Sequence, residues 1–393
     1  MRKINKIRYD ALQTREKNNL TRHRLKLSSP QATQIILDNN DKKSYLNFSS
    51  NNYLGLANHP DVMMAMKNAV DKFGVSACSS DMVTGHTVAH HDLEQKLAQI
   101  SNKPRALIFA NGFMANMAIN TTLYKKTNFI YQDKLNHSSA ILGGLASDAT
   151  LVRYAHLDAA HLLSKIKVRD GGGAIMSESI FSMGGDFAPL QRLSNIATEN
   201  DLDLIIDDAH GFGVLGDNGL QVADDYNDNS NVIYMATLGK ALGCYGAYVA
   251  GSDLVCDTLL QFAPQHIYTT ALPVAVIRAA DKALDVMQKE NWRVEKLSES
   301  IHYFKKLASS FNIKLTKSNT AIQPIIIGDN QKTIDISSYL KNNGIIVGAI
   351  RPPTVPKNFA RLRITLTAEH SPAQIKTLVK AINEAVIFHK LNL

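Results

Sequence analysis

The stretch "MATLGKALGCYGAYVAGS", residues 235–252, decides how this chain folds and what it can bind. An apolar run ends at Leu238, and Lys240 follows it among glycines at positions 239, 243, 246 and 251. A buried lysine is costly unless its pKa falls or its amine is consumed in a covalent bond. Glycines leave room for a bound molecule to approach the backbone. The stretch therefore favours a ligand-facing lysine at the exit of a buried strand over the alternative, a surface lysine in a flexible loop.

The composition is that of a globular protein with a large core. Of 393 residues, 45% are hydrophobic and 20% are charged, and we expect the core to be divided between two lobes. The net charge of +8 favours anionic ligands such as phosphates, carboxylates or coenzyme A. The basic residues are dispersed, which argues against nucleic acid, and no apolar run approaches the ~20 residues of a membrane span. Three cysteines without metal-ligand spacing fit a reducing cytoplasm, where we expect the protein to reside.

Short apolar runs alternate with helical patterns between about residues 100 and 260. Because these runs are unbroken rather than alternating, they predict strands that are buried on both faces. The expected fold is α/β, with a mostly parallel central sheet flanked by helices in a large domain over residues 51–280. The strands are expected at 106–110, 128–133, 151–156, 173–181, 202–208, 231–238 and 246–252.

The two ends of the chain differ from this central part. After Pro273, two long helical patterns are followed by three strands and a last helix, which predicts a smaller α+β C-terminal domain over residues 281–393. Residues 1–50 are expected to hold a basic N-terminal helix, over 1–25, and a linker. Residues 59–74 predict a helix with Val62, Met66, Ala69 and Phe73 on one face.

Polar residues follow several of the predicted strands. In "LDLIIDDAHGFGVLG" (202–216), a strand ends in Asp207 and Asp208, and His210 comes next. The carboxyl ends of strands line the ligand crevice of an open α/β sheet, so Asp207 can pair there with a buried cation. A turn cap and a divalent metal site are the alternatives. We expect no metal, because no further ligand motif completes a shell.

The other strand exits carry groups suited to a phosphorylated ligand. A helix begins at Gly112 and Phe113 in "FANGFMANMAIN", and its backbone N–H groups can hold a phosphate. His137 follows the strand in "YQDKLNHSS", and Ser182 follows the strand in "SESIFSMGGD". Serine hydrolysis is an alternative for Ser182, but the serine lacks the GxSxG motif. Thr237, three residues before Lys240, can hold a phosphate or a hydroxyl group.

Together these groups match what pyridoxal 5′-phosphate (PLP) requires. A lysine forms the Schiff base with the coenzyme, and an aspartate pairs with the pyridinium nitrogen. A helix N-terminus and hydroxyl groups take the phosphate, and a flat side chain covers the ring. The residues that would do so are Gly112, His137, Ser182, Asp207, His210, Thr237 and Lys240.

The order of motifs along nearly the whole chain resembles the α-oxoamine synthases, a family of fold-type I PLP enzymes. The resemblance rests on "FSSNNYLGLANHP", "DKLNHSS", "ESIFSMGGD", "DDAHGFGVLG", "TLGKALG" and "RLRITLTAEH". The tail, with "AIQPIIIGDN" and "GAIRPPTVP", is most similar to the biotin-pathway branch of the family. Two departures are Asn52, where the family usually has aspartate, and Cys244, where it often has glycine.

The resemblance implies a role for each motif residue at the coenzyme. Lys240 would hold the coenzyme, Asp207 would pair with the ring nitrogen and His210 with the phenolic oxygen. His137 would stack on the ring, and Lys240, His137, Asp207 and His210 would be the catalytic residues. The phosphate and ring substituents would be supported by Gly112, Phe113, Ser182, Thr237 and, from the neighbouring subunit, Thr270.

The resemblance also implies substrates and an assembly. The chain would condense L-alanine with pimeloyl-CoA or pimeloyl-acyl carrier protein, as a homodimer with its active site at the subunit interface. Arg363 would bind the amino-acid carboxylate, with Arg361 as the other candidate. Arg22 (or Arg24), Asn51, His137 and Thr354 would contact substrate.

Other functions remain open from the sequence. Glycine C-acetyltransferase, 5-aminolevulinate synthase and serine palmitoyltransferase share the same catalytic core and differ in the acyl pocket. A non-catalytic α/β protein that binds a phosphate ligand is a second hypothesis, which the presence of both Lys240 and Asp207 disfavours. The third hypothesis is a metal-dependent hydrolase built on Asp207, Asp208 and His210.

Overall fold

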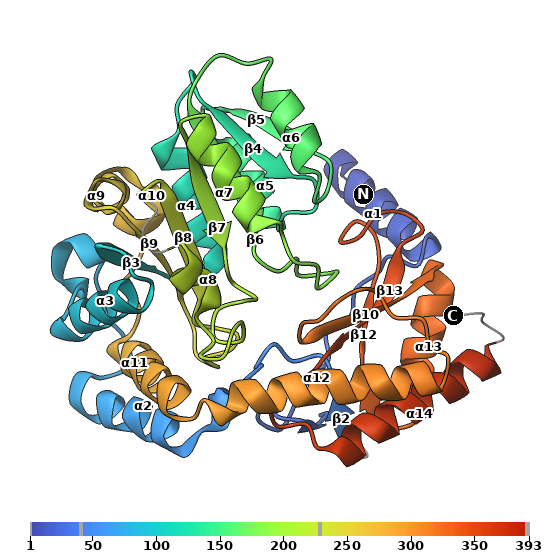
Figure 1. Cartoon of the computed structure of the whole chain (residues 1–393). Coiled ribbons are helices and arrows are strands. Elements are labelled where there is room, and N and C mark those ends of the chain that lie inside the picture. The colour runs from blue at the N-terminus through green and yellow to red at the C-terminus, as the bar shows by residue number, and fades with distance from the viewer. Residues whose placement is uncertain (1, 39–41, 227–229, 390–393) are drawn as a thin grey trace. The chain divides into compact units, whose positions relative to one another are not determined.

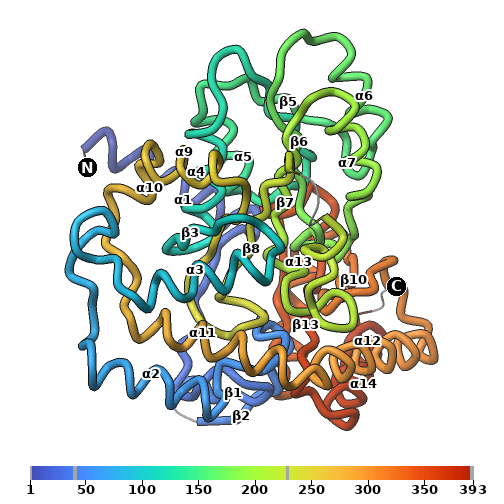
Figure 2. The backbone as a smooth tube through the Cα atoms, turned by 60° about the vertical axis from the view of Figure 1, so that its left-hand side comes forward, coloured from blue at the N-terminus to red at the C-terminus, as the bar shows by residue number. Residues whose placement is uncertain are grey.

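The computed structural model describes residues 2–38, 42–226 and 230–389 (Figures 1 and 2). Within these residues the chain divides into two compact units. The larger unit comprises 51–182 and 186–296, and the smaller comprises the N-terminal residues to 50, the segment 183–185 and the C-terminal residues from 297. The division into domains at residues 50 and 280 stays a prediction.

The larger unit is built on a seven-stranded sheet with the order β3-β9-β8-β7-β6-β4-β5. Only β9 is antiparallel to its neighbours β3 and β8, and the other neighbouring pairs are parallel. The predicted α/β fold with a mostly parallel sheet is therefore confirmed. The strands are β3 (Arg105–Phe109), β4 (Phe129–Asp133), β5 (Thr150–Tyr154), β6 (Gly173–Glu178), β7 (Leu202–Asp207), β8 (Val232–Thr237) and β9 (Ala247–Gly251).

Helices lie along this sheet and bury its apolar strands (Figures 1 and 2). In β7, for example, the side chains of Leu204, Ile205 and Ile206 are completely buried, as the unbroken apolar run predicted. The helices are α2 (Pro60–Phe73), α3 (Val88–Ile100), α4 (Gly112–Leu123), α5 (Ser138–Ala146), α6 (Ala159–Ile166), α7 (Leu190–Glu199), α8 (Gln221–Asp225), α9 (Asp253–Phe262), α10 (Pro264–Ile267) and α11 (Val274–Lys289), with short turns η1 (Leu56–Asn58) and η2 (Asp81–Gly85).

The predicted helix over 59–74 is present as α2, but only part of its predicted face is buried. Val62 and Ala69 are buried, whereas Met66 and Phe73 are 42% and 43% exposed. Helical periodicity states which residues share a face, but the extent of the surface that covers that face is decided by distant parts of the chain.

The smaller unit contains two three-stranded sheets, with the orders β1-β2-β11 and β10-β13-β12. One of the three strands predicted after Pro273, "GIIVGAI" (344–350), is divided between the two sheets, since β11 pairs with β2 and β12 pairs with β13. The elements are α1 (Lys3–Lys17), β1 (Gln34–Ile36), β2 (Ser44–Asn47), β10 (Ile322–Gly328), α13 (Asn330–Asn342), β11 (Ile345–Ile346), β12 (Gly348–Ile350), β13 (Ala360–Thr365) and α14 (Pro372–Phe388), while α12 (Trp292–Ser310) spans the division between the units.

The N-terminal helix is shorter than the sequence predicted. It ends at Lys17, and Asn19 adopts the left-handed conformation with φ 57°. Asparagine tolerates this conformation better than most residues, so the chain leaves the helix here and residues 18–25 are not helical. In the part of the chain that the structure describes, no helix combines the length and apolar character needed to cross a membrane.

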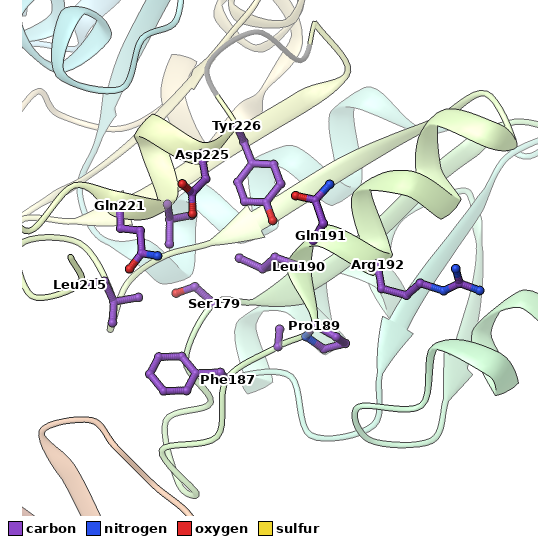
Figure 3. Close-up of a pocket in the computed structure, with 12 residues that line it drawn as sticks. Ser179, Phe187, Pro189, Leu190, Gln191, Arg192, Leu215, Gln221, Asp225 and Tyr226 are labelled. Carbon is purple, nitrogen blue, oxygen red and sulfur yellow. The ribbon is translucent and has the colours of Figure 1, made fainter.

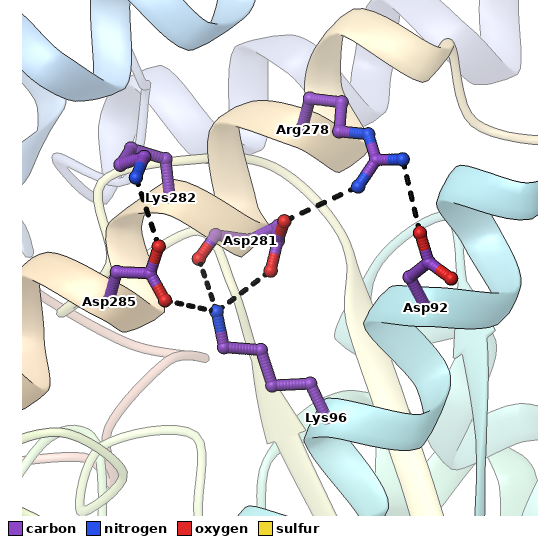
Figure 4. Close-up of polar contacts among 6 residues, drawn as sticks. All are labelled: Asp92, Lys96, Arg278, Asp281, Lys282 and Asp285. Atoms are coloured by element: carbon purple, nitrogen blue, oxygen red, sulfur yellow. Dashed lines mark hydrogen bonds and ion pairs between the residues drawn. The ribbon is translucent and has the colours of Figure 1, made fainter.

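An ion-pair network joins α3 to α11 in the larger unit (Figure 4). The Lys96 Nζ atom lies 2.8 Å from Asp281 Oδ1 and 2.6 Å from Asp285 Oδ1, and it also donates to the carbonyl oxygen of Asp281. Burial favours the protonated form of Asp285, but the ammonium groups of Lys96 and Lys282 outweigh it and hold the pKa of this carboxyl below its usual value. The network therefore stabilises the fold while the aspartates are ionised.

We expect the Lys96→Met variant to unfold at lower denaturant concentration than the parent protein. The methionine keeps the packing of the stem but leaves two carboxylates without their shared cation, which costs about 1 to 2 kcal/mol at pH 7. Because the pKa of Asp285 is lowered in the folded state, this contribution is present at neutral pH and is lost as the pH falls through that pKa, below 3.8. Urea unfolding at pH 7 and at pH 3 measures the difference.

Lys282→Met is the matched control, because Lys282 contacts only the Oδ2 atom of Asp285, at 3.0 Å, among the residues of this network. Its effect should be smaller than that of Lys96→Met. Equal effects of the two substitutions, or a Lys96→Met effect that persists unchanged at pH 3, would contradict the proposed network.

Candidate active site

A cavity of about 180 Å³ opens where β6, β7 and β8 end. Glu178, the last residue of β6, is the Cα partner of Asp207, the last residue of β7, and Asp207 is in turn the partner of Met235 in β8. Parallel strands that end together bring residues distant in sequence to one edge of the sheet. The cavity is lined by Gly112, Phe113, Asn116, His137, Ser139, Glu178, Asp207, Ala209, His210, Met235, Thr237 and Lys240.

The cavity brings together seven of the residues that the sequence predicted for the site. They come from four parts of the chain: the start of α4, the residue before α5, the end of β7 with the loop after it, and the end of β8 with the loop after it. The structure therefore brings residues from these predicted strand ends together at one cavity. The seven residues are Gly112, Phe113, His137, Asp207, His210, Thr237 and Lys240.

Asp207 is held as a hydrogen-bond acceptor at the base of the cavity. Its side chain is 5% exposed, its Oδ2 atom accepts a hydrogen bond from Asn116 Nδ2 at 2.8 Å, and its Oδ1 atom accepts one from the Ala209 N–H at 3.0 Å. Asn116 Nδ2 also donates to Ser139 Oγ at 2.9 Å, which fixes the amide. Two donors thus bind the two oxygens of this carboxyl group, which can pair with a cationic group of a ligand.

The loop that carries Lys240 is shaped by its glycines and by Thr237. The Thr237 hydroxyl donates to the Gly246 carbonyl oxygen at 2.9 Å and accepts from the Gly239 N–H at 3.2 Å. Gly243 has φ 64°, and a Cβ atom there would lie 2.3 Å from the backbone nitrogen of Ala57. No other residue fits at position 243 without displacing the backbone. The glycines thus let the loop close tightly and place half-buried Lys240 at the cavity.

His137 and His210 line the cavity with fixed orientations. His137 precedes α5, and its Nδ1 atom lies 2.7 Å from Ser139 Oγ. Burial lowers the pKa of His137, the charge of Asp207 opposes this shift, and the charge of Lys240 adds to it. The Nδ1 atom of His210 lies 2.6 Å from the hydroxyl of Tyr53. A neutral His137 ring presents a flat face on which an aromatic ligand can stack.

The N-terminus of α4 forms another part of the cavity. Asn111 caps the helix, since its Oδ1 atom accepts from the Met114 N–H at 3.0 Å. A Cβ atom at Gly112 would meet only Met235 Cε, at 4.0 Å, so the space beside this residue is open. The first N–H groups of a helix have no intrahelical acceptor, and they are suited to an anion such as a phosphate.

Two of the predicted coenzyme residues do not line this cavity. Ser182 is 8% exposed, and its backbone N–H donates to Glu178 Oε2 at 3.1 Å. Thr270 is exposed and lines a separate cavity of about 20 Å³ with His90 and His266. Neither observation tests the roles that the family resemblance implies, and these roles stay predictions.

The predicted substrate residues belong mostly to the smaller unit. Arg22 Nη2 donates to Thr354 Oγ1 at 3.1 Å, so two of them lie together, whereas Arg24 is exposed. On β13, Arg363 donates to Thr365 Oγ1 at 3.1 Å. Arg361 donates to the carbonyl oxygens of Phe359 and Met183, both at 3.1 Å. In the larger unit, Asn51 Oδ1 accepts from the Tyr53 hydroxyl at 3.3 Å.

Sequence reasoning missed three polar residues of the cavity: Asn116, Ser139 and Glu178. Asn116 lies one helical turn after Gly112, so its spacing was a usable signal once the helix was expected to begin there. Glu178 could have been found from the strand ends, because it terminates its strand as Asp207 does. Ser139 carried no signal of its own, because its part in the cavity depends on its hydrogen bond to Asn116 in α4.

A second, larger cavity of about 590 Å³ lies beside α7 and α8 (Figure 3). It contains none of the predicted site residues. Asp225, Gln221 and Tyr226 lie on one side of it and Phe187 on the other, and no lysine lines it. The cavity of about 180 Å³ that Lys240 lines is therefore the candidate active site. In the described part of the chain, no three histidine, cysteine, aspartate or glutamate side chains are grouped as metal ligands.

The residues of the smaller cavity fit PLP. A half-buried lysine, an aspartate held by two donors, a flat histidine and an open helix N-terminus surround one space. Two buried polar atoms in it, Asn116 Oδ1 and Glu178 Oε1, have no hydrogen-bond partner among the described residues, as expected where a polar ligand belongs. The sheet and this lysine define the class of fold-type I PLP-dependent enzymes.

Comparison with known proteins identifies the family. The family model for aminotransferase class I and II matches residues 43–382. The 8-amino-7-oxononanoate synthase of Ectopseudomonas mendocina (strain ymp) is 42% identical over 376 residues, which cover 95% of this chain and 96% of that protein. The chain therefore belongs to the aminotransferase class I and II family, in the group of the 8-amino-7-oxononanoate synthases.

Solved structures agree with this assignment. The 8-amino-7-oxononanoate synthase of Francisella tularensis is 32% identical, with a TM-score of 0.76 over 88% of this chain and 99% of that chain. The serine palmitoyltransferase of Sphingomonas wittichii is 24% identical, with a TM-score of 0.91 over 98% of each chain, and shows the same fold. The predicted family resemblance, fold-type I fold, PLP cofactor and acyltransferase class are thereby confirmed.

Proposed function

We propose that this chain condenses L-alanine with a pimeloyl thioester and releases 8-amino-7-oxononanoate, CO₂ and the free thiol carrier, as a step of biotin biosynthesis. The observation that carries the proposal is the convergence of Lys240, Asp207, His137 and His210 on one cavity, in a chain 42% identical to a synthase of this name. The thiol carrier is coenzyme A or acyl carrier protein.

The residues of the cavity would share the work of binding the coenzyme. When bound, PLP supplies an electron-withdrawing ring that stabilises negative charge on the α-carbon of the amino acid. Lys240 would hold the coenzyme covalently through Nζ and, once released, take the α-proton of alanine. Asp207, whose oxygens accept hydrogen bonds from Asn116 and Ala209, would hold a proton on the ring nitrogen.

The remaining cavity groups would orient the coenzyme. The backbone N–H groups of Gly112 and Phe113 would bind its phosphate, supported by the hydroxyls of Thr237 and Ser182. His137 would cover the ring. His210, fixed by Tyr53 at 2.6 Å, would donate to the phenolic oxygen.

The overall reaction balances with these groups. The α-C–H bond of alanine breaks, a C–C bond to the thioester carbonyl forms, and the C–S bond breaks to release the thiol. The bond to the alanine carboxylate then breaks to give CO₂, and a proton returns to the same carbon. Lys240 is the cavity group that can take a proton and give it back.

Four further residues would contact substrate. Arg363 would bind the carboxylate of alanine, and Arg22 and Thr354, which already share a hydrogen bond, would contact substrate together with Asn51. Thr270 would reach the coenzyme phosphate of a second subunit in a homodimer, a role suited to its exposed position.

We expect Arg363→Ala to raise the KM for alanine by at least about tenfold, because a carboxylate loses a charge-assisted partner. The KM for the acyl donor should change little. Arg361→Ala is the comparison, and it should lower thermal stability instead, since Arg361 donates to two backbone carbonyls. Steady-state kinetics with each substrate varied in turn decide the matter. A selective rise in the KM for the acyl donor would mean that Arg363 does not bind alanine.

Product analysis tests the proposed function itself. Purified protein supplied with PLP would be given alanine or glycine, each with acyl-CoA donors of graded chain length and with pimeloyl-acyl carrier protein. The expected product is 8-amino-7-oxononanoate, from alanine and the pimeloyl donors. Preferred use of glycine with an acetyl, succinyl or palmitoyl donor would instead assign another α-oxoamine synthase activity.

A further inference from the structure

Glu178 lines the candidate active site but has no part in the proposed chemistry. It ends β6, and its Cα partner is Asp207 at the end of β7. Neighbouring parallel strands direct paired residues to the same face of the sheet, and both side chains line the same 180 Å³ cavity. Two carboxyl groups are thus brought to one space that the coenzyme is proposed to occupy.

The two oxygens of Glu178 have different surroundings. The side chain is only 3% exposed, and Oε2 accepts the Ser182 N–H at 3.1 Å. Oε1 is buried and has no hydrogen-bond partner among the described residues. An ionised carboxylate with one such oxygen would carry a large desolvation cost, whereas a carboxylic acid loses much less.

Ionising both Asp207 and Glu178 would cost much free energy, because both carboxyl groups are buried. Like charges that share a buried site disfavour each other, so one of two neighbouring carboxyl groups retains its proton. Asp207 has two donors, Asn116 and Ala209, one for each oxygen, whereas Glu178 has one, the Ser182 N–H. Glu178 is therefore the carboxyl group that we expect to keep its proton.

The electrostatic surroundings agree with this geometry. Burial raises the pKa of Glu178 to about 8, and the charge of Asp207 adds to the shift. The charge of Lys240 and the nearby backbone N–H groups of Ser182 and His137 act in the opposite direction, although the His137 N–H does not reach hydrogen-bond geometry with Oε1. Asp208 follows Asp207 in the chain, and burial raises its pKa to about 7. Its carboxyl oxygens accept hydrogen bonds from the hydroxyls of Ser179 and Tyr234. His210 also faces the cavity.

We propose that Glu178 is a positioning residue of this site: as a neutral acid it accepts the Ser182 N–H and adds no negative charge beside Asp207. The inference rests on the proposed coenzyme site. Its consequence is an alkaline limit. When Glu178 loses its proton, a second negative charge enters the cavity and repels the anionic coenzyme, so PLP binds less tightly as the pH rises through about 8.

Three variants test the proposal, with PLP itself as the probe. Glu178→Gln keeps a carbonyl oxygen for the Ser182 N–H and cannot ionise. At pH 7 its dissociation constant for PLP should lie within about threefold of that of the parent protein. Between pH 7 and 9.5 the dissociation constant of the parent should rise by a factor about tenfold larger than that of the variant. Glu178→Met, of similar length, should bind about tenfold more weakly at pH 7.

Glu94→Gln is the matched control. Glu94, on α3, is a partly buried glutamate whose pKa is raised to about 7 chiefly by burial, and it accepts the Ile108 N–H at 3.0 Å. This variant should bind PLP as the parent does at every pH. Dissociation constants come from fluorescence titration of the apoprotein.

Infrared spectroscopy of the apoprotein adds a readout that needs no bound coenzyme. The carbonyl stretch of a protonated carboxylic acid should be present at pH 7, diminish through about pH 8 and lose one component in Glu178→Gln. If this component is missing at pH 7, or if Glu178→Gln binds PLP as poorly as Glu178→Met, Glu178 is ionised and the proposal is overturned. If PLP fails to bind the parent protein at all, the proposed function is wrong, and the infrared result still decides the state of Glu178.

Discussion

The Lys240→Ala variant is expected to lose covalent attachment of PLP and, with it, turnover. The side-chain amine is the group that would bind the coenzyme and move the α-proton of alanine, and alanine at this position can do neither. Loss of a general base alone lowers rates by about 10²–10⁴-fold, and loss of the covalent link should add to this. The measurements are borohydride reduction with mass spectrometry of the peptide around residue 240, and product formation at saturating PLP.

Lys240→Arg separates the charge of Lys240 from its chemistry. Arginine keeps a cation in the loop, but its guanidinium does not deprotonate and cannot replace the amine. This variant should be as inactive as Lys240→Ala. Lys167→Ala, at an exposed lysine after α6, should keep the pyridoxyl adduct and full turnover. An adduct on a lysine other than Lys240, or normal turnover of either Lys240 variant, would refute the assignment.

Asp207→Asn is expected to bind PLP yet lower turnover by about 10²–10³-fold. The asparagine amide is nearly isosteric with the aspartate carboxyl group. Its oxygen can still accept the hydrogen bond that Asp207 Oδ2 accepts from Asn116 Nδ2 at 2.8 Å. It carries no charge, so it cannot hold a proton on the ring nitrogen, and the electrostatic stabilisation of negative charge on the substrate is lost. Turnover and PLP affinity are to be measured on the same preparation.

Asp203→Asn provides the control on the same strand. Asp203 lies near the start of β7, and its Oδ2 atom accepts from the Tyr124 hydroxyl at 2.8 Å, away from the cavity. Its substitution should leave turnover at saturating PLP unchanged. An unchanged rate in Asp207→Asn would remove the proposed role of this carboxylate. A loss of PLP binding without a loss of turnover per bound coenzyme would do so as well.

Local sequence was sufficient for most of the larger unit. Buried strands need continuous apolar runs, and runs such as that of β7 are short and bounded by charged or small residues. The antiparallel direction of β9 was missed, although it had a signal. Only residues 238–246 connect β8 to β9, and a parallel neighbour requires a much longer crossover.

The residues that line the candidate site were predicted as far as each residue followed a strand. Lys240, Asp207 and His137 were found because chemistry in an α/β sheet collects at the carboxyl ends of its strands. Glu178 and Asn116 were missed because their importance comes from a partner. Asn116 matters through its 2.8 Å bond to Asp207, and Glu178 through the pairing of β6 with β7.

The sequence by itself determined the class of fold, the lysine loop with its glycines and the family to which the chain belongs. These features are local, since apolar runs and glycine-rich turns act through backbone geometry within a few residues. Only the tertiary structure decided which carboxyl group shares the cavity with Asp207, which donors bind the oxygens of Asp207, and that Met66 and Phe73 of α2 stay exposed. The charge state of a buried group and the burial of a face depend on what distant segments bring beside them, and no local pattern encodes that.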